Sequence, residues 1–299
     1  MSQRTLVLKV PPAERTSLRG RLSADEFEFR SVPHALFSAK GQGVVATLYK
    51  SGKFVVQGAD PDVFVARYVE GATPVPPKEK KADDAGGVER VPTTTLIGSD
   101  ECGKGDYFGP LVVCAVRMEP DEAAKLADSG VVDSKALKDD RALQLGAALR
   151  GVLPHAVRRL DPPEYNDRHA ALKNVNLLLA DLHAEAIRAL AQPGDEVLID
   201  QFSKKDLFEE RLGDLGLRIR QAPRAEANLA VAAASIIARE EFLTRLDELS
   251  GEAAIRLRKG AGAPTDAAGV EYARLHGAEA LRAVAKLHFK NTEKVHRRL

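Results

Sequence analysis

Four acidic side chains border apolar segments of the sequence, at places where a fold can bring them together. Asp100 and Glu101 follow one apolar segment. Asp200 ends a second, and Glu226 comes shortly before the small apolar residues 229–239. Carboxylate oxygens are the ligands that Mg²⁺ prefers, and two metal ions about 3.5–4 Å apart hydrolyse a phosphodiester when several carboxylates hold them. The set therefore predicts metal-dependent phosphodiester hydrolysis.

Each acid also has a simpler explanation. Asp100 and Glu101 can be solvated acids of a β-turn. Asp200 can cap a helix, and Glu226 can interact with the dipole of the helix that follows it. Spacing alone leaves these alternatives open, because it does not show that the four carboxylates converge. The seven histidines lack the paired spacing of a zinc hydrolase, and no Ser/His/Asp arrangement stands out as a competing site.

A glycine-rich segment follows the first two acids. Successive side chains of a strand point to opposite faces, so Asp100 and Glu101 can share a site only if the backbone bends between or after them. Gly103 and Gly105 permit such a bend. They also allow backbone groups to approach a ligand closely, as a ribose or a phosphate requires.

The segments that carry these residues alternate between strand and helix patterns, which favours an α/β domain with its site at the strand ends. This predicted catalytic domain covers residues 93–299. Its expected strands are 93–98, 110–118, 196–200 and 218–221, and its expected helices are 141–151, 175–191, 205–212 and 228–249.

A smaller N-terminal domain, residues 1–71, is predicted before a linker at 72–92, where Pro, Gly and charged residues replace the hydrophobic pattern. Its pattern indicates a β-α-β-β-β-α unit. Such a unit can bury one sheet face under its helices and leave the other free to bind something flat or elongated. The expected strands are 5–10, 35–40, 44–49 and 54–57, and the expected helices are 13–22 and 62–69.

The composition fits a globular intracellular protein. The chain has 299 residues and 44% hydrophobic content, enough for two domains with real cores. Its net charge of +1 does not indicate a polyanionic partner, but residues 254–299 carry ten Lys and Arg against four Asp and Glu. Two cysteines, Cys102 and Cys114, suit a reducing cytoplasm. No signal peptide and no apolar run of membrane-spanning length is present.

Three segments resemble the type 2 ribonuclease H superfamily. GSDECGKGDYFGPLVVCAV, residues 98–116, resembles its opening signature, and the DYFGP continuation is similar to the ribonuclease HIII form. RAEANLAVAAASIIAR, residues 224–239, resembles the second block. Residues 257–262 and 285–294 resemble the C-terminal block. These matches extend over most of residues 96–294 in the expected order, and their combination is highly specific.

The resemblance implies roles for the four acids. Asp100 and Glu101 match the first two catalytic acids of the family, Asp200 matches the third, and Glu226 matches the fourth. All four are then ligands of Mg²⁺ or Mn²⁺, with two ions per site during catalysis. Glutamate at the last position is similar to the HIII pattern, whereas the HII pattern usually has aspartate.

The resemblance also implies substrate-binding residues. Gly103, Lys104 and Gly105 fall where the superfamily has a Gly-x-Gly whose backbone recognises the ribose 2′-hydroxyl. Lys104 departs from the family pattern, in which the HII form typically has arginine and HIII often a small polar residue. Ser134 and Lys135 match a DSK segment expected near the nucleic-acid backbone, although a helix cap followed by a solvated lysine explains them equally well.

The implied fold is α/β, a ribonuclease H-like mixed sheet with flanking helices, plus a small α+β N-terminal domain resembling half of the TATA-binding protein. The implied protein is a monomeric cytoplasmic endonuclease that cuts the RNA strand of RNA/DNA hybrids and leaves 3′-hydroxyl and 5′-phosphate ends. No membrane and no protein partner is indicated. Two alternatives stay open: an HII-like enzyme that incises at single ribonucleotides in DNA, and a hybrid-binding protein that does not cleave.

Overall fold

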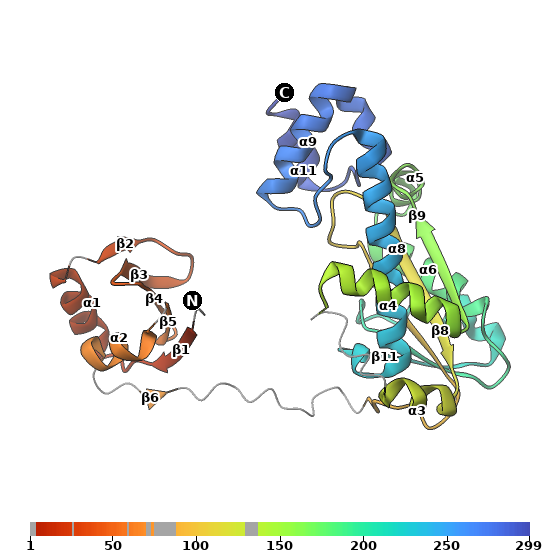
Figure 1. Ribbon diagram of the computed structural model, residues 1–299, viewed down its shortest axis with the longest axis horizontal. Coiled ribbons are helices and arrows are strands. Elements are labelled where there is room, and N and C mark those ends of the chain that lie inside the picture. Colours follow the sequence, from red (N-terminus) through yellow and green to blue (C-terminus); the bar gives the residue numbers. More distant parts are fainter. Residues whose placement is uncertain (1–3, 26, 59, 70–72, 75–87, 129–136) are drawn as a thin grey trace. The chain divides into compact units, whose positions relative to one another are not determined.

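The chain forms two units in a computed structural model, residues 1–82 and residues 83–299 (Figure 1). The structure describes residues 4–25, 27–58, 60–69, 73–74, 88–128 and 137–299. The division falls within the segment 72–92 that the sequence predicts as a linker. Among the described residues, no helix is both long and apolar enough to cross a membrane.

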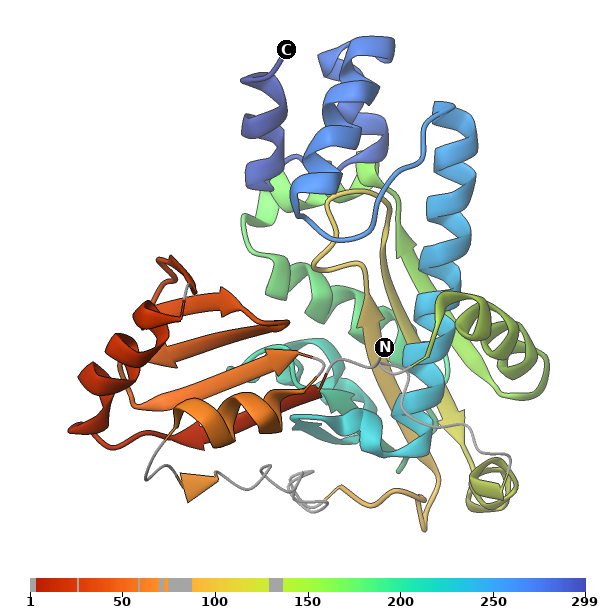
Figure 2. The ribbon, with the colours of Figure 1, turned by 60° about the vertical axis from the view of Figure 1, so that its left-hand side comes forward.

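The N-terminal unit is one antiparallel sheet with two helices. The strand order is β2-β3-β4-β5-β1-β6. The helices pack on one face, where Leu18, Leu22 and Phe64 lie in the same core as Phe54 (Figure 2). The elements are β1 (Arg4–Lys9), α1 (Glu14–Ala24), β2 (Glu28–Arg30), β3 (Ala35–Gly41), β4 (Val44–Tyr49), β5 (Lys53–Gly58), α2 (Pro61–Tyr68) and β6 (Thr73–Pro74).

Two strands of this unit differ from the sequence expectation. β2 is missing from the predicted β-α-β-β-β-α order, because its three residues are too short to show an alternating pattern. β6 lies in the predicted linker, where Thr73 pairs with Lys9 of β1. The face without helices carries a row of paired strand residues that includes Lys9 opposite Lys53, and Ser38 hydrogen bonded to Thr47 at 2.9 Å. Among the described residues this face is open, and it mixes polar side chains with apolar ones such as Val45, the partner of Lys40.

The C-terminal unit is built on a five-stranded sheet in the order β11-β10-β7-β8-β9. β7 pairs in parallel with β10, and β10 with β11, whereas β8 pairs antiparallel with β7 and with β9. The predicted mixed sheet is thus confirmed. The strands are β7 (Leu96–Cys102), β8 (Leu111–Met118), β9 (His155–Leu160), β10 (Glu196–Asp200) and β11 (Arg218–Ala222).

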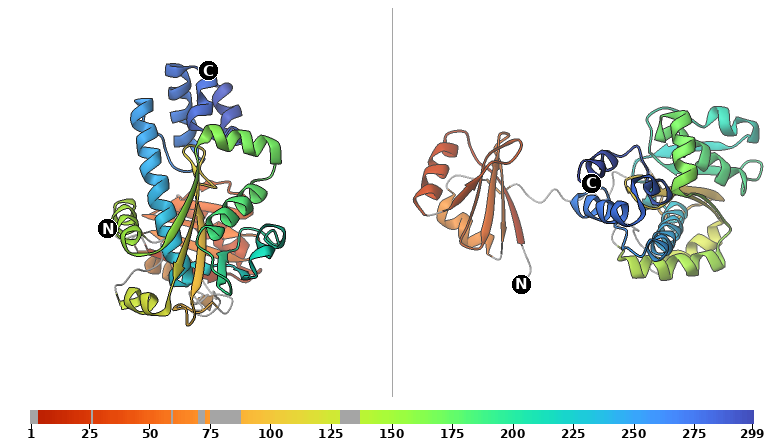
Figure 3. Two further views of the ribbon diagram at one scale, coloured as in Figure 1. Left: turned by 90° about the vertical axis from the view of Figure 1, so that its right-hand side faces the viewer. Right: turned by 90° about the horizontal axis from the view of Figure 1, so that it is seen from above.

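Helices cover both faces of this sheet (Figure 3). α8 and α4 pack on one face and α6 on the other, so β8 has apolar residues pointing both ways and is buried almost throughout. The helices are α3 (Pro120–Asp128), α4 (Asp139–Val152), α5 (Pro162–Leu172), α6 (Val175–Arg188), α7 (Glu209–Leu212), α8 (Leu229–Ala253), α9 (Ala263–His276), α10 (Leu281–Val284) and α11 (Lys290–His296), with a 3₁₀ turn η3 (Ala225–Ala227) before α8.

Several of these elements were not expected from the sequence. β9 contains two arginines, and they hide its strand pattern. α3 and α5 begin with a proline, and α9 has one at its second residue; proline is tolerated in a first helical turn but resembles a loop residue in a sequence. The helix predicted at 205–212 is only α7, because Asp206 Oδ1 accepts the Phe208 backbone N–H and forms a turn before the helix. β7 runs four residues beyond the predicted strand end at Gly98.

Close packing of β7 against α8 depends on Gly98. A methyl group at this position would meet the backbone of Ala230 and Val231, which cannot move like a side chain. We expect Gly98→Ala to destabilise the fold by about 1–3 kcal/mol, as overpacked cores do, measured by urea unfolding. Gly251→Ala is the matched control: Gly251 lies in α8 with open space around it, and alanine there should stabilise by about 0.5–1 kcal/mol. Equal stability of the two variants would contradict this packing argument.

Candidate active site

Asp100 lies in β7 on the face that α8 covers. It is buried at 8% exposure, hydrogen bonds with Ser235 of α8, and its Oδ1 accepts the Glu101 backbone N–H at 2.8 Å. Burial raises the pKa of Asp100 above its ordinary value, and the nearby charges of Glu101 and Asp200 raise it further. Asp100 is therefore a carboxylate whose negative charge the surrounding protein opposes.

Glu101 points from β7 toward α6 on the opposite face. Its Oε2 lies 3.5 Å from Nε2 of His183, and its Oε1 lies 3.6 Å from Nζ of Lys104. Burial alone would raise the pKa of Glu101, but contact with His183 and the charge of Lys104 hold this pKa below its ordinary value. Neighbouring acids on one strand thus have opposite electrostatic environments.

The backbone does not bend between these two acids. Asp100 pairs with Cys114 and Glu101 with Val113 in an unbroken ladder. The glycine turn comes after Cys102, so only the second form of the expected bend, one after the acids, is present. The two side chains leave β7 toward different helices. The charge of Glu101 still raises the pKa of Asp100.

Asp200 and Glu226 come from the neighbouring strand and the turn that follows it. Asp200 ends β10, whose Ile199 pairs with Ser99 of β7, and its charge contributes to the raised pKa of Asp100. Oδ1 of Asp200 accepts the Ala225 backbone N–H at 2.8 Å, so it does cap the turn η3. This bond places Glu226, the next residue, beside the same strand ends.

Asn228 explains the start of α8 without Glu226. Its side chain accepts the Ala230 backbone N–H at 2.9 Å and caps the helix. Glu226 lies in η3, before this cap, rather than in the first turn of α8. The structure therefore gives less support than the sequence does to Glu226 as a partner of the α8 dipole.

The structure brings the four acids to adjoining chain segments but does not gather their carboxylates. Within the described parts of the chain, no three Asp, Glu, His or Cys side chains are arranged to hold a metal ion. The residues nevertheless fit a divalent cation. Their oxygens are the hard ligands that Mg²⁺ and Mn²⁺ take, and a cation beside Asp100 would relieve the repulsion that raises its pKa.

The glycine turn after the acids requires glycine at position 103, and Lys286 of the C-terminal segment holds it. Gly103 has φ +92°, and a Cβ there would meet the Pro110 carbonyl oxygen, so glycine is required. Nζ of the fully buried Lys286 donates to the carbonyl oxygens of Asp106 at 3.0 Å and Gly109 at 2.7 Å. Lys104 is about one-third exposed, and Gly105 has open space around it.

The other two predicted substrate-binding residues, Ser134 and Lys135, lie outside the described residues. Three buried or half-buried residues around the acids were not singled out by the sequence: His183, Phe202 and Lys286. A lone histidine in an apolar helix and a lysine in a basic tail resemble ordinary residues. Only their burial, visible in the structure, sets them apart.

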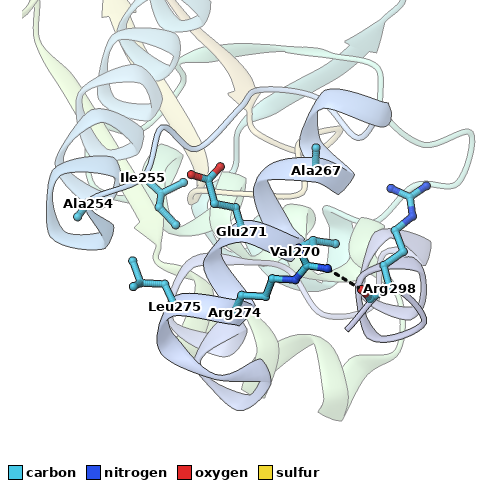
Figure 4. Close-up of a pocket in the computed structure, with 8 residues that line it drawn as sticks. All are labelled: Ala254, Ile255, Ala267, Val270, Glu271, Arg274, Leu275 and Arg298. Carbon is cyan, nitrogen blue, oxygen red and sulfur yellow. Dashed lines mark hydrogen bonds between the residues drawn. The ribbon is translucent and has the colours of Figure 1, made fainter.

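Two hollows of the C-terminal unit differ in their relation to the acids. A hollow of about 700 Å³ between the end of α8 and α9 is lined by residues such as Leu275 and Arg274, which donates to the Arg298 carbonyl oxygen (Figure 4). It lies at the far end of α8, a helix of 25 residues and so about 37 Å long. A polar hollow of about 390 Å³, lined by Gln201 and Lys204, begins directly after Asp200.

Family models match both units. A model described as ribonuclease HII covers residues 97–292. A model described as a domain of unknown function covers residues 5–81.

Curated relatives match nearly the whole chain. Ribonuclease HIII of Bacillus licheniformis is 37% identical over 97% of both chains, and ribonuclease HIII of Streptococcus thermophilus is 37% identical over 99% of both. A crystal structure of Bst-RNase HIII in complex with Mn²⁺ is similar with a TM-score of 0.66 and 35% identity, covering 98% of each chain. The structure of RNase H3 from Aquifex aeolicus has a TM-score of 0.55 and 26% identity, covering 95% of this chain and all of that one.

Proposed function

This chain belongs to the ribonuclease HIII family and is a ribonuclease H, and on that premise we propose that it hydrolyses the RNA strand of RNA/DNA hybrids with divalent metal. One observation carries the proposal. Burial raises the pKa of Asp100, and the nearby charges of Glu101 and Asp200 raise it further. A cation beside Asp100 would offset the repulsion from these two charges and favour its ionised form.

The metal would be held by Asp100, Glu101, Asp200 and Glu226, and we propose Mg²⁺ or Mn²⁺, two ions per site. When bound, the ions supply an activated water and stabilise the departing 3′-oxygen, which leaves 3′-hydroxyl and 5′-phosphate ends. The Mn²⁺ complex of the similar Bst-RNase HIII supports this choice of metal.

The chain's own residues supply position and charge. Lys104 lies beside Glu101 at the edge of the acidic site, where its ammonium can contact a phosphate of the substrate. Gly103 and Gly105, on either side of Lys104, leave room for backbone groups of this turn to reach a ribose 2′-hydroxyl, the group that distinguishes RNA from DNA. Lys286 holds this turn in place by donating to the Gly109 carbonyl oxygen. We propose that Ser134 and Lys135 add contacts to the nucleic-acid backbone.

The N-terminal unit is proposed to hold the substrate. Its helix-free face is a broad sheet surface that carries exposed Lys9, Lys40 and Lys53, and lysines on such a surface bind phosphates without regard to base sequence. We propose the boundaries 1–71, 72–92 and 93–299 for the binding domain, the linker and the catalytic domain.

The direct test is cleavage of a labelled RNA/DNA hybrid, beside a DNA duplex that contains a single ribonucleotide, with Mg²⁺, Mn²⁺ or EDTA. We expect metal-dependent cutting of the hybrid, with 5′-phosphate ends on the products. Cutting of the single-ribonucleotide duplex as well would indicate HII-like selectivity. Binding of the hybrid without cutting in either metal would contradict the proposed enzyme.

A further inference from the structure

The fully buried His183 of α6 lies between the first acid strand and the loop of the third acid. Its Nδ1 is 2.7 Å from Oγ of Ser99, and Ser99 also hydrogen bonds with the Cys114 carbonyl oxygen at 2.9 Å. Its Nε2 faces Oε2 of Glu101 at 3.5 Å. The ring therefore contacts β7 at two positions on the same face, one of them a candidate metal ligand.

The ring has no freedom to turn away from Glu101. Phe202 stacks on it with ring centroids 5.1 Å apart and planes 11° apart, and Phe208 packs edge-on at 6.3 Å. Phe202 follows Asp200 by two residues, so the same stack also fixes the loop after the third acid. A carboxylate repels a lone pair, so the contact with Glu101 favours the tautomer that carries the proton on Nε2. Nδ1 then accepts from the Ser99 hydroxyl, which in the other tautomer donates to the Cys114 carbonyl oxygen.

Burying the imidazole of His183 costs free energy of folding, which suggests a functional reason for this residue. His183 is 0% exposed, and a buried imidazole loses its hydrogen bonds to water. Leucine would fill the same place in an apolar helix without that loss. The polar contacts of both ring nitrogens go to β7, the strand that carries Asp100 and Glu101.

We propose that His183 is a positioning residue that holds the carboxylate of Glu101 in the orientation the metal requires, in the way outer partners orient metal ligands in other proteins. Through Nδ1 the ring is anchored on Ser99, and through Nε2 it restrains Oε2 of Glu101, while Oε1 lies on the side of Lys104. This proposal rests on the proposed metal site. It assigns no direct contact of His183 with substrate or metal.

Two conservative variants separate the two ring nitrogens. Asparagine places its amide where Nδ1 lies and loses the contact to Glu101. Glutamine places its amide where Nε2 lies and keeps that contact. Mn²⁺ affinity of the full chain, measured by isothermal titration calorimetry, should fall by roughly 10-fold or more in His183→Asn, and His183→Gln should recover most of it. Melting temperatures in EDTA report whether either variant is simply less folded.

The outcomes are distinct. Wild-type affinity in His183→Asn would overturn the proposal, and so would equal losses in both variants, which would indicate packing alone. If His183→Asn does not fold, Ser99→Ala serves instead, because it frees the ring without removing it. A smaller loss of Mn²⁺ affinity would then support the proposal, and an unchanged affinity would overturn it. Absence of Mn²⁺ binding in the wild-type chain would overturn the metal site together with this inference.

Discussion

Asp100→Asn should abolish hybrid cleavage and, at the same time, make the metal-free protein more stable. Asparagine removes a charge that interacts with the proposed metal, and several kcal/mol of transition-state stabilisation go with it. At 1.36 kcal/mol per tenfold change in rate, this corresponds to a loss of about 10³-fold or more. Cleavage of labelled hybrid at saturating Mg²⁺ measures the loss. Binding of the hybrid should be retained, and full activity in the variant would exclude Asp100 as a ligand.

The gain in stability follows from the sign of the pKa shift. The pKa of Asp100 is raised in the fold, first by burial and then by Glu101 and Asp200. The folded state therefore holds this proton more tightly than the unfolded chain, and the stability that the proton provides is lost as pH rises through the raised pKa. Asparagine does not ionise. Its advantage in melting temperature should be small near the ordinary aspartate pKa of 3.8 and should grow toward alkaline pH.

The melting measurement is made in EDTA and in Mn²⁺. Adding Mn²⁺ should raise the melting temperature of the wild-type chain and leave the variant nearly unchanged, because only the wild type has the full set of charges that favour the cation. If the melting-temperature difference between the variant and the wild type does not change with pH, the fold does not oppose ionisation of Asp100. Such sacrifice of stability for a reactive site is common in enzymes.

Asp195→Asn is the matched control at the other end of the same sheet. Asp195 is also buried, but it accepts hydrogen bonds from Arg117 at 3.0 and 3.3 Å and from the Gln192 backbone N–H at 2.9 Å. The same substitution there weakens a paired charge, so it should lower the melting temperature and leave the activity of the folded fraction unchanged. Opposite signs for two identical substitutions would show that the effect depends on whether the surrounding protein opposes or pairs the charge that is removed.

The sequence identifies which acids form the candidate site, but it does not predict how their side chains are arranged. The acids stand at the ends of apolar runs, and the mixed sheet that positions Asp100 and Asp200 on adjacent strands follows the predicted alternation of elements. The unbroken pairing of β7 through Glu101 could not be foreseen, because the glycines after it suggest an earlier strand end. His183 could not be foreseen either, since its partners Ser99 and Glu101 are about eighty residues away in the sequence.

The second large effect is expected on the N-terminal unit, whose open face carries Lys9, Lys40 and Lys53. Changing all three to glutamine should weaken hybrid binding at physiological salt far more than it slows turnover at saturating substrate. The reason is counterion release: each lysine on a phosphate contributes about one unit to the slope of log affinity against log salt. Fluorescence anisotropy across a salt series measures that slope, and deletion of residues 1–71 should lower it at least as much.

The matched control removes positive charge from the helix side of the same unit, with Arg19 and Arg67 changed to glutamine. Arg19 lies on α1 over the Phe29 ring and Arg67 on α2 beside Tyr68, so neither lies on the open sheet face. If charge alone attracts the hybrid, both sets of variants lose affinity in proportion to the charge removed. If the open face is the binding surface, only the lysine variant changes the salt slope, and its KM rises while kcat stays constant. Unchanged binding in the lysine variant and in the deletion would assign this unit a purpose other than holding substrate.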